Sequence, residues 1–274
     1  MSGGQNEVQA TFWLVDAPDS LLLQSETQPD GVGLGTFEPD GRPRLWRKPV
    51  AANRSETFVH GAQQVRSRTF LAHIRHATAA EPTLENTHPF EQHGRLFAHN
   101  GVLGELDALR ARLGEHEALI QGATDSELYF TLMTKRIEEH DGDVAAGITA
   151  AANELAAEQL LYSLNMILTT GTDVWALRYP DTNELWVLER TLGSVGDLSA
   201  DTGITRVFSG QLAIIPATVI ASQPMDQNPG WRVLESGELI HVDADLNVSS
   251  EIVVTEPPAK MMELSTQEAV AQAE

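Results

Sequence analysis

Three short segments of the 274-residue sequence carry polar groups that could together bind a small charged molecule. Arg75 stands three residues before Thr78, and its guanidinium fork suits a carboxylate held by two parallel hydrogen bonds. Asn100-Gly101 offers a side-chain amide and an accessible backbone N–H, two donors that can hold a developing oxyanion. Asp125 could bind an ammonium group. Together these groups describe recognition of an α-amino acid with a hydrolysable side-chain amide.

Each group also has a commoner structural role. An arginine is most often part of a surface ion pair, and an Asn-Gly pair is most often a turn. An aspartate in the first turn of a helix is usually a favourable partner of the helix dipole. No single segment is therefore specific, and the interpretation depends on their combination.

Regular elements place these residues at the ends of strands and helices. Residues 70–76 alternate, with Phe70, Ala72 and Ile74 on one face and Leu71, His73 and Arg75 on the other, which predicts a strand. Residues 95–99 alternate likewise and end at Asn100-Gly101. Thr124 to Glu127 match a capping box, in which Thr124 is the N-cap and the Glu127 side chain returns to the backbone of Thr124. This motif predicts a helix that begins here and runs to about residue 139. Leu103, Leu106, Leu109 and Leu113 recur at helical spacing, which predicts another helix with Gly114 as its stop, and a third helix is predicted over 144–158.

The remaining sequence is dominated by strand signals. Strands are predicted over 174–179 and 185–189, joined by a hairpin-type turn at Pro180 to Asn183. Other predicted strands cover 164–169, 206–209, 212–215, 231–235 and 239–242. Strands, then helices, then strands favour two sheets with helices outside them, an α+β layered architecture. We expect one domain over residues 1–255 and a polar, loosely attached tail over 256–274.

Composition excludes several classes of function. Acidic residues outnumber basic ones 39 to 18, and a net charge of −21 disfavours binding to nucleic acid or to an anionic membrane surface. No apolar run is long enough to span a bilayer and no basic region precedes an apolar stretch at the N-terminus, so we expect a soluble, cytoplasmic protein. The absence of cysteine excludes disulfides, thiolate zinc sites and cysteine nucleophiles within these residues.

Other enzyme classes find little support, and no metal or cofactor is expected. His73 and His76 lie three apart on a strand and so face opposite sides, and no His-Glu-x-x-His helix is present. Gly31, Gly33 and Gly35 do not have the dinucleotide-binding spacing, and a turn rather than a helix follows them. A Gly-x-Ser-x-Gly elbow is also absent.

The order of the motifs resembles the class II glutamine amidotransferase family, most closely its stand-alone bacterial members. The likeness rests on HxRxAT from His73, NTHPF from Asn86 continuing to HNG at His99, and TDSE from Thr124. It extends with specific motifs from about residue 12 to 130, and more weakly to about residue 242. The resemblance implies a four-layer αββα sandwich of the N-terminal-nucleophile hydrolase type. It also implies an N-terminal cysteine that attacks the glutamine side-chain amide, with its own α-amino group as base.

Site roles carry over from this resemblance. Arg75 and Thr78 match positions that bind the glutamine α-carboxylate, Asn100 and Gly101 match the oxyanion hole, and Asp125 matches the residue that binds the α-amino group. Structural roles are assigned to the histidines within the motifs: His73, His76, His88 and His99. The implied ligand is glutamine or a γ-glutamyl compound, and a separate ammonia-accepting synthetase is a possible partner. The family usually has an aromatic where this chain has Val32, which would alter that edge of the pocket.

The sequence departs from the family at its start. Met1-Ser2-Gly3-Gly4 stands where the family has Met-Cys and an apolar strand, so we expect a strand of about five residues and its cysteine to be missing and the chain as written to be inactive. Either the start was assigned to an internal methionine, which the intact binding residues favour, or the protein is a degenerate relative. Ser2 is not expected to replace the cysteine, because the glycines after it are poor strand material. The alternative function is binding of glutamine or a γ-glutamyl ligand without turnover, as a sensor or partner subunit.

Overall fold

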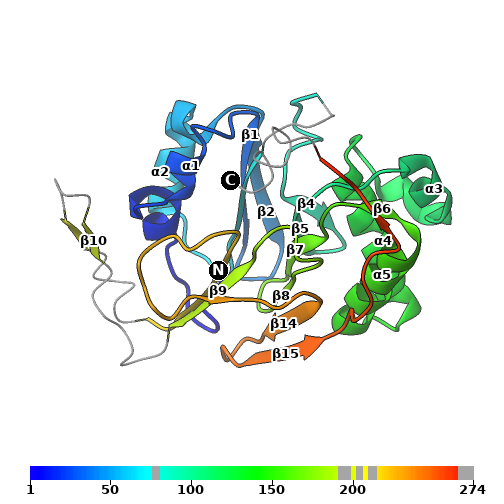
Figure 1. Ribbon diagram of the computed structural model, residues 1–274. Helices are drawn as coiled ribbons and strands as arrows, with labels where there is room; N and C mark the ends of the chain where they lie inside the picture. Colours follow the sequence, from blue (N-terminus) through cyan, green and yellow to red (C-terminus); the bar gives the residue numbers. More distant parts are fainter. Residues whose placement is uncertain (76–80, 191–198, 202–205, 209–214, 265–274) are drawn as a thin grey trace.

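Two layers of β-sheet lie face to face, with helices on both outer sides (Figure 1). The structure is a computed structural model that describes residues 1–75, 81–190, 199–201, 206–208 and 215–264. Successive side chains of each strand point to opposite faces of its sheet. One face packs on the other sheet and the opposite face packs on helices, which produces the layers. The predicted α+β sandwich with αββα layers is confirmed.

One layer is a six-stranded antiparallel sheet that carries Asn100 at a strand end. Its strands, in spatial order, are β15 (Val248–Ile252), β14 (Glu238–Val242), β8 (Val174–Leu177), β7 (Asn165–Thr169), β5 (Arg95–Asn100) and β4 (Phe90–Gln92). Its outer face packs on α4 (Asp125–Glu139) and α5 (Val144–Glu158), where Phe97 and Leu168 join one core with Tyr129. Both helices begin at side-chain caps, since Thr124 accepts from the Glu127 N–H and Asp143 accepts from the Ala146 N–H.

The facing layer consists of two three-stranded halves. One half is β2 (Pro43–Lys48), β1 (Gly31–Phe37) and β3 (Leu71–Arg75); the other is β12 (Ala217–Ala221), β9 (Trp186–Arg190) and β13 (Arg232–Val233). Among the described residues, only the first residues of the chain lie between β3 and β12. The Ser2 N–H donates to Thr218 O over 2.8 Å, and the Phe70 N–H donates to Met1 O over 2.9 Å. These bonds join the backbones of the two halves through Met1 and Ser2.

Helices also cover the outer face of this second layer. They are a π-helical turn (Phe12–Asp16), α1 (Leu21–Gln24), a short 3-10 helix (Ala52–Arg54) and α2 (Glu56–Gln64). Phe70, Ala72 and Ile74 belong to the core under these helices, whereas Leu71 packs against Leu96 between the sheets. The predicted facing is therefore confirmed for the described part of the segment, which ends at Arg75.

The glycines of β1 allow the two sheets to approach closely. A Cβ on Gly33 would lie 1.9 Å from His88 O, and one on Gly35 would lie 2.6 Å from Leu96 Cδ1. No side chain fits at Gly33, so its main chain packs directly on the main chain of the segment that precedes β4, and Gly35 leaves room for the Leu96 side chain. Val32 points the other way and is fully buried under the outer helices. Its expected effect on the edge of the pocket stays a prediction.

Several predicted elements differ from the structure. The Pro180 to Asn183 turn is no hairpin, because β8 belongs to the six-stranded sheet and β9 to the other layer. The helix predicted near Leu103–Leu113 is shorter: α3 covers Leu106–Ala111, and a 3-10 segment follows at Gly114–Leu119. The strand predicted over 206–209 corresponds to β11 (Arg206–Phe208), which pairs with β10 (Ser199–Asp201). The strand predicted over 212–215 lies almost wholly outside the described residues.

The start of the predicted tail is held against the body. β16 (Lys260–Met261) pairs in parallel with β6 (Leu160–Leu161), and the Tyr179 hydroxyl donates to Glu256 O over 2.9 Å. The expectation of loose attachment is thus wrong for residues 256–264, and residues 265–274 lie outside the described part. No helix in the described ranges is both long and apolar enough to cross a bilayer.

Candidate active site

Arg75 is the last residue of β3 and lies on the face that looks toward the other sheet. Its side chain is only 7% exposed, and its backbone carbonyl accepts from the Asp30 N–H over 3.0 Å. Burial lowers the pKa of Arg75, while the nearby carboxylates of Asp30 and Asp125 act in the opposite direction. Because the pKa of an arginine is so high, the guanidinium stays charged at neutral pH. A buried cation therefore lies within electrostatic reach of Asp125.

Asp125 joins the start of α4 to the loop that follows β5. Its Oδ2 accepts from the Leu103 N–H over 2.7 Å, and its Oδ1 accepts from the Ser126 N–H over 2.9 Å. The Ser126 hydroxyl also donates to Oδ1, over 3.4 Å. A carboxylate has about four acceptor positions, so these three bonds leave capacity for a ligand ammonium group. The same carboxylate thus fixes the loop containing Gly101 and presents negative charge near Arg75.

Glu127 holds the loop that enters α4. The expected contact with the backbone of Thr124 is wrong, because its carboxylate accepts instead from the N–H groups of Gln121 (2.9 Å) and Gly122 (2.7 Å). Asn86 supports the same loop by accepting from the Ala123 N–H over 2.8 Å. The carboxylate satisfies two backbone donors in this way, and it fixes the approach to Asp125.

Asn100 and Gly101 provide two donors at the end of β5. Asn100 Oδ1 accepts from Asn183 Nδ2 over 3.4 Å, whereas Asn100 Nδ2 makes no hydrogen bond within the described residues and is not enclosed. The Gly101 N–H likewise donates to no group in the described ranges. A Cβ at Gly101 would lie 2.1 Å from Ser163 O, so only glycine fits. A side-chain N–H and a backbone N–H are therefore adjacent and available, as an oxyanion site requires.

Three histidines lie among these groups: His88 and His99 are buried and His73 is partly buried. His99 contacts Ser126 Oγ through Nδ1 (3.0 Å) and Ser163 O through Nε2 (2.9 Å), so it links α4 to the segment before β7. The His73 and His88 rings lie against each other with centroids 4.2 Å apart and an interplanar angle of 32°. Burial lowers the pKa of His73 to about 4 and that of His88 well below its ordinary value. Both rings are therefore neutral near pH 7.

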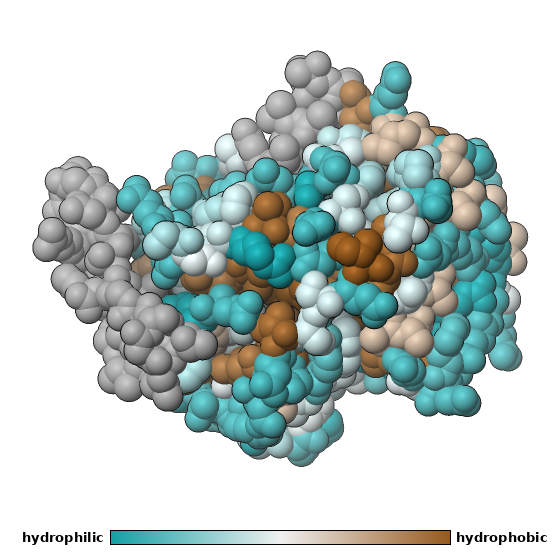
Figure 2. All heavy atoms as spheres, turned by 60° about the horizontal axis from the view of Figure 1, so that its bottom comes forward, coloured by the Kyte–Doolittle hydropathy of each residue, from teal (hydrophilic) through white to brown (hydrophobic). Residues whose placement is uncertain are grey.

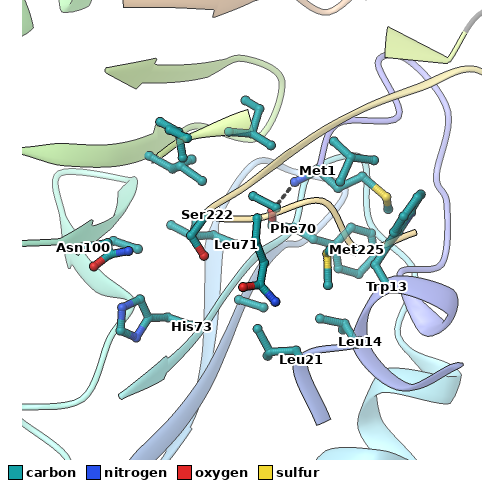
Figure 3. A pocket seen from close by; sticks show the side chains of 18 of the residues that line it. Met1, Trp13, Leu14, Leu21, Phe70, Leu71, His73, Asn100, Ser222 and Met225 are labelled. Carbon is teal, nitrogen blue, oxygen red and sulfur yellow. Dashed lines mark hydrogen bonds between the residues drawn. The ribbon is translucent and has the colours of Figure 1, made fainter. Parts of the chain in front are cut away.

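An apolar cavity of ≈ 140 Å³ opens between β3 and β12. Asn100 and His73 line one end, and Trp13, Leu21 and Met225 line the other (Figure 3). The Met1 amino group beside it donates to Phe70 O over 2.9 Å, and burial lowers the pKa of this amine to about 5. Viewed from below, the molecule is mostly polar, with apolar side chains visible in a central hollow (Figure 2). The unfilled space thus adjoins the donor end of Asn100.

Most of the residues selected from the sequence come together. Asp125 contacts the loop of Asn100-Gly101 and lies within electrostatic reach of Arg75, whereas Thr78 and His76 lie outside the described residues. Sequence reasoning missed Asn183, whose only signal was its place in a turn. In the described part of the chain, no group of three His, Cys, Asp or Glu side chains has a geometry suited to a metal ion.

The stacked sheets and outer helices define the fold of the N-terminal-nucleophile hydrolases. Residues 22–267 match the family of class-II glutamine amidotransferases, and the protein belongs to this family. It is 36% identical over 222 residues to "Putative glutamine amidotransferase YafJ" of Escherichia coli, covering 76% of this chain and 83% of that one.

Other similarities agree with this assignment. The chain is 26% identical over 239 residues to "Gamma-glutamyl-hercynylcysteine sulfoxide hydrolase" of Mycolicibacterium smegmatis, covering 84% of this chain and 88% of that one. A solved glutamine aminotransferase class-II domain protein from Silicibacter pomeroyi superposes with a TM-score of 0.57 at 21% identity, covering 82% of this chain and 92% of that one. At this identity the likeness in structure concerns the fold.

Proposed function

We propose that this protein acts on the side-chain amide of glutamine or of a γ-glutamyl compound. The observation that carries the proposal is the placement of a buried cation, a carboxylate and two free N–H donors around one site: Arg75, Asp125, Asn100 and Gly101. An amino acid has a carboxylate and an ammonium group at fixed separation, and charges of both signs are needed to bind it. The name of the M. smegmatis relative supports a γ-glutamyl substrate.

Each group has a defined part in the proposed reaction. Arg75 and Thr78 would hold the α-carboxylate, and the free acceptor positions of Asp125 would take the α-ammonium group. The side-chain amide carbonyl would then face Asn100 Nδ2 and the Gly101 N–H. Both donors are fixed before the substrate arrives, so they stabilise the negative charge that develops on this oxygen during attack. No cofactor is required for these steps.

The nucleophile in this proposal is a cysteine that the 274 residues do not contain. Ser2 bridges Thr69 on one side and Thr218 on the other, antiparallel to both. An extended segment placed ahead of Met1 in the same register would run along β3 toward Arg75 and fill the space between β3 and β12. This register would bring the start of that segment to the site, and the buried strand would provide a rigid mount. The chain as written is accordingly proposed to bind ligand without hydrolysing it.

The product of the reaction would be ammonia or an amine. Several relatives carry names of glutamine-dependent transferases, such as "Glutamine--fructose-6-phosphate aminotransferase [isomerizing]", in which this chain covers 28% of the length. Delivery of ammonia to a separate synthetase and simple hydrolysis of a γ-glutamyl compound are both compatible with the proposed site. The two differ in whether a second protein increases the rate of amide cleavage.

Calorimetric titration with L-glutamine tests the recognition half of the proposal. We expect the chain to bind glutamine, and Arg75→Gln to weaken binding by about 10- to 100-fold, as expected when a hydrogen bond to a charged group is lost. Arg44→Gln is the matched control, since that side chain is 70% exposed in a surface ion pair with Glu38. Equal affinity of Arg75→Gln and wild type would contradict the assigned role.

Addition of a strand tests the catalytic half. A version beginning Met-Cys and continuing as an apolar strand into Met1 should release ammonia from glutamine, whereas its Cys→Ser counterpart should not. If the cysteine version binds glutamine but hydrolyses no γ-glutamyl amide, the protein is better explained as a sensor or partner subunit. N-terminal sequencing of the protein from its native source would show which of the two forms exists.

A further inference from the structure

Asn183 lies in the segment that crosses from β8 to β9, and its side chain faces Asn100. It is 3% exposed, and its Nδ2 donates to Asn100 Oδ1 over 3.4 Å. Its own Oδ1 is enclosed and has no hydrogen-bond partner among the residues that the structure describes. The contact with Asn100 is thus the one hydrogen bond made by this buried side chain in the described part of the chain. Buried amides normally satisfy more of their capacity.

The main chain at Asn183 is held by two buried side chains. Arg178 Nε donates to Asn183 O over 2.9 Å, and Asn165 Nδ2 donates to the same oxygen over 3.1 Å. Arg178 is anchored in turn by a bond from its Nη1 to Leu234 O over 2.7 Å. Asn165 also lies directly opposite Asn100 in the pairing of β5 with β7. The Asn183 side chain is therefore presented to Asn100 from a fixed backbone.

We propose that Asn183 is a positioning residue that orients the Asn100 carboxamide in the oxyanion site. The proposal rests on the function proposed above. A carboxamide has a donor end and an acceptor end, and rotation about its last side-chain bond exchanges them. The donor of Asn183 engages the acceptor end of Asn100, which leaves Nδ2 for the substrate carbonyl. With the two ends of Asn100 exchanged, its oxygen would face the substrate carbonyl and the site would repel its ligand.

Two substitutions at Asn183 distinguish its role in orienting the Asn100 amide from its role in packing. Asn183→Ala removes the donor and lets the Asn100 amide turn. Asn183→Asp keeps the shape but offers only acceptors when ionised, so it attracts Asn100 Nδ2 and draws the amide into the wrong orientation. Asn183→Asp changes the polarity of the side chain at constant shape, whereas Asn183→Ala truncates it. The loss of affinity for glutamine should therefore be larger for Asn183→Asp than for Asn183→Ala.

The experiment compares the affinities for L-glutamine and L-norvaline by calorimetry in wild type, Asn183→Ala and Asn183→Asp. L-Norvaline has the same α-groups and carbon chain as glutamine but lacks the side-chain carbonyl. We expect Asn183→Ala to weaken glutamine binding by about 2- to 10-fold, the range for one hydrogen bond, and Asn183→Asp to weaken it further. Binding of norvaline should stay unchanged in both variants. Asn153→Asp is the control, because Asn153 lies on the exposed side of α5.

Distinct results would overturn the inference. Wild-type affinity for glutamine in Asn183→Asp would show that Asn183 does not orient the site. Equal weakening for both amino acids would show that Asn183 only supports the structure, and a far-ultraviolet spectrum would show whether the variant is folded. Failure of the wild type to bind either amino acid would overturn the proposed function itself, and this inference with it.

Discussion

A methyl group added at Gly101 should disturb both the stability and the ligand affinity of this protein. The added Cβ would lie 2.1 Å from Ser163 O and 2.6 Å from His99 Nε2. Carbon and oxygen atoms need more than about 3 Å, so the segment must move by roughly 1 Å. The His99 ring cannot move freely, because it contacts both Ser126 and Ser163. The backbone of the oxyanion site must therefore shift.

The size of the effect follows from overpacking. Insertion of a methyl group into a well-packed interior typically costs about 1–3 kcal/mol. In a protein of this size a loss of about 1 kcal/mol lowers Tm by about 2–4 °C, so Gly101→Ala should lose roughly 2–12 °C in differential scanning calorimetry. Its affinity for L-glutamine should fall as well, because the Gly101 N–H moves with the backbone.

Gly61→Ala is the matched control for this experiment. Gly61 lies within α2, and a Cβ there would meet no atom within 4 Å. Because alanine favours a helix over glycine by about 1 kcal/mol, the control should keep or raise Tm. If Gly101→Ala behaves like Gly61→Ala in both Tm and glutamine affinity, the close approach of Gly101 to Ser163 is not a real constraint.

Two further predictions concern acid sensitivity and helix capping. Burial lowers the pKa of His73 to about 4, so between pH 4 and 6.5 the unfolded chain binds more protons than the folded chain. The free energy of unfolding should therefore fall by up to about 3 kcal/mol as the pH is lowered from 6.5 toward 4. Tm measured against pH should show this decline. The decline should be smaller in His73→Leu and unchanged in His60→Leu. The same dependence of Tm on pH in His73→Leu as in wild type would contradict the prediction. Thr124→Ala removes the cap of α4 and should cost about 1 kcal/mol in urea unfolding, whereas Thr149→Ala within α5 should cost less. Similar losses in both threonine variants would argue against the cap.

Local signals were sufficient to predict much of the fold. The 144–158 helix matches α5 at both ends, and the Thr124 cap marks the start of α4, because both depend on residues that are neighbours in sequence. β1 was missed as a strand, since Gly31, Gly33 and Gly35 are poor strand formers. Gly33 is required because His88 O, in the segment before β4, would lie 1.9 Å from a Cβ placed on it. No local pattern in the sequence reveals such an approach.

The site was predictable only in part for the same reason. Arg75, Asn100 and Asp125 stand in recognisable motifs, and the structure places Asp125 against the loop after Asn100 and near Arg75. Their roles toward a ligand remain predictions. Asn183 carries no comparable signal, because the Pro180 turn indicates a change of direction but not the sheet that the next strand joins. Its contact with Asn100 exists only because the chain crosses between layers there.

The backbone junction that Met1 to Gly3 form between the two halves of the second layer has a consequence for folding kinetics. Ser2 pairs at once with Thr69 and with Thr218, residues that are far from it and from each other along the chain. Contacts between such distant residues carry a high loop-closure entropy and form slowly. Both halves must already be in place before Met1 to Gly3 can bridge them, so this junction should close last during refolding. Amide protons there should then exchange earlier than those of β5 and β7.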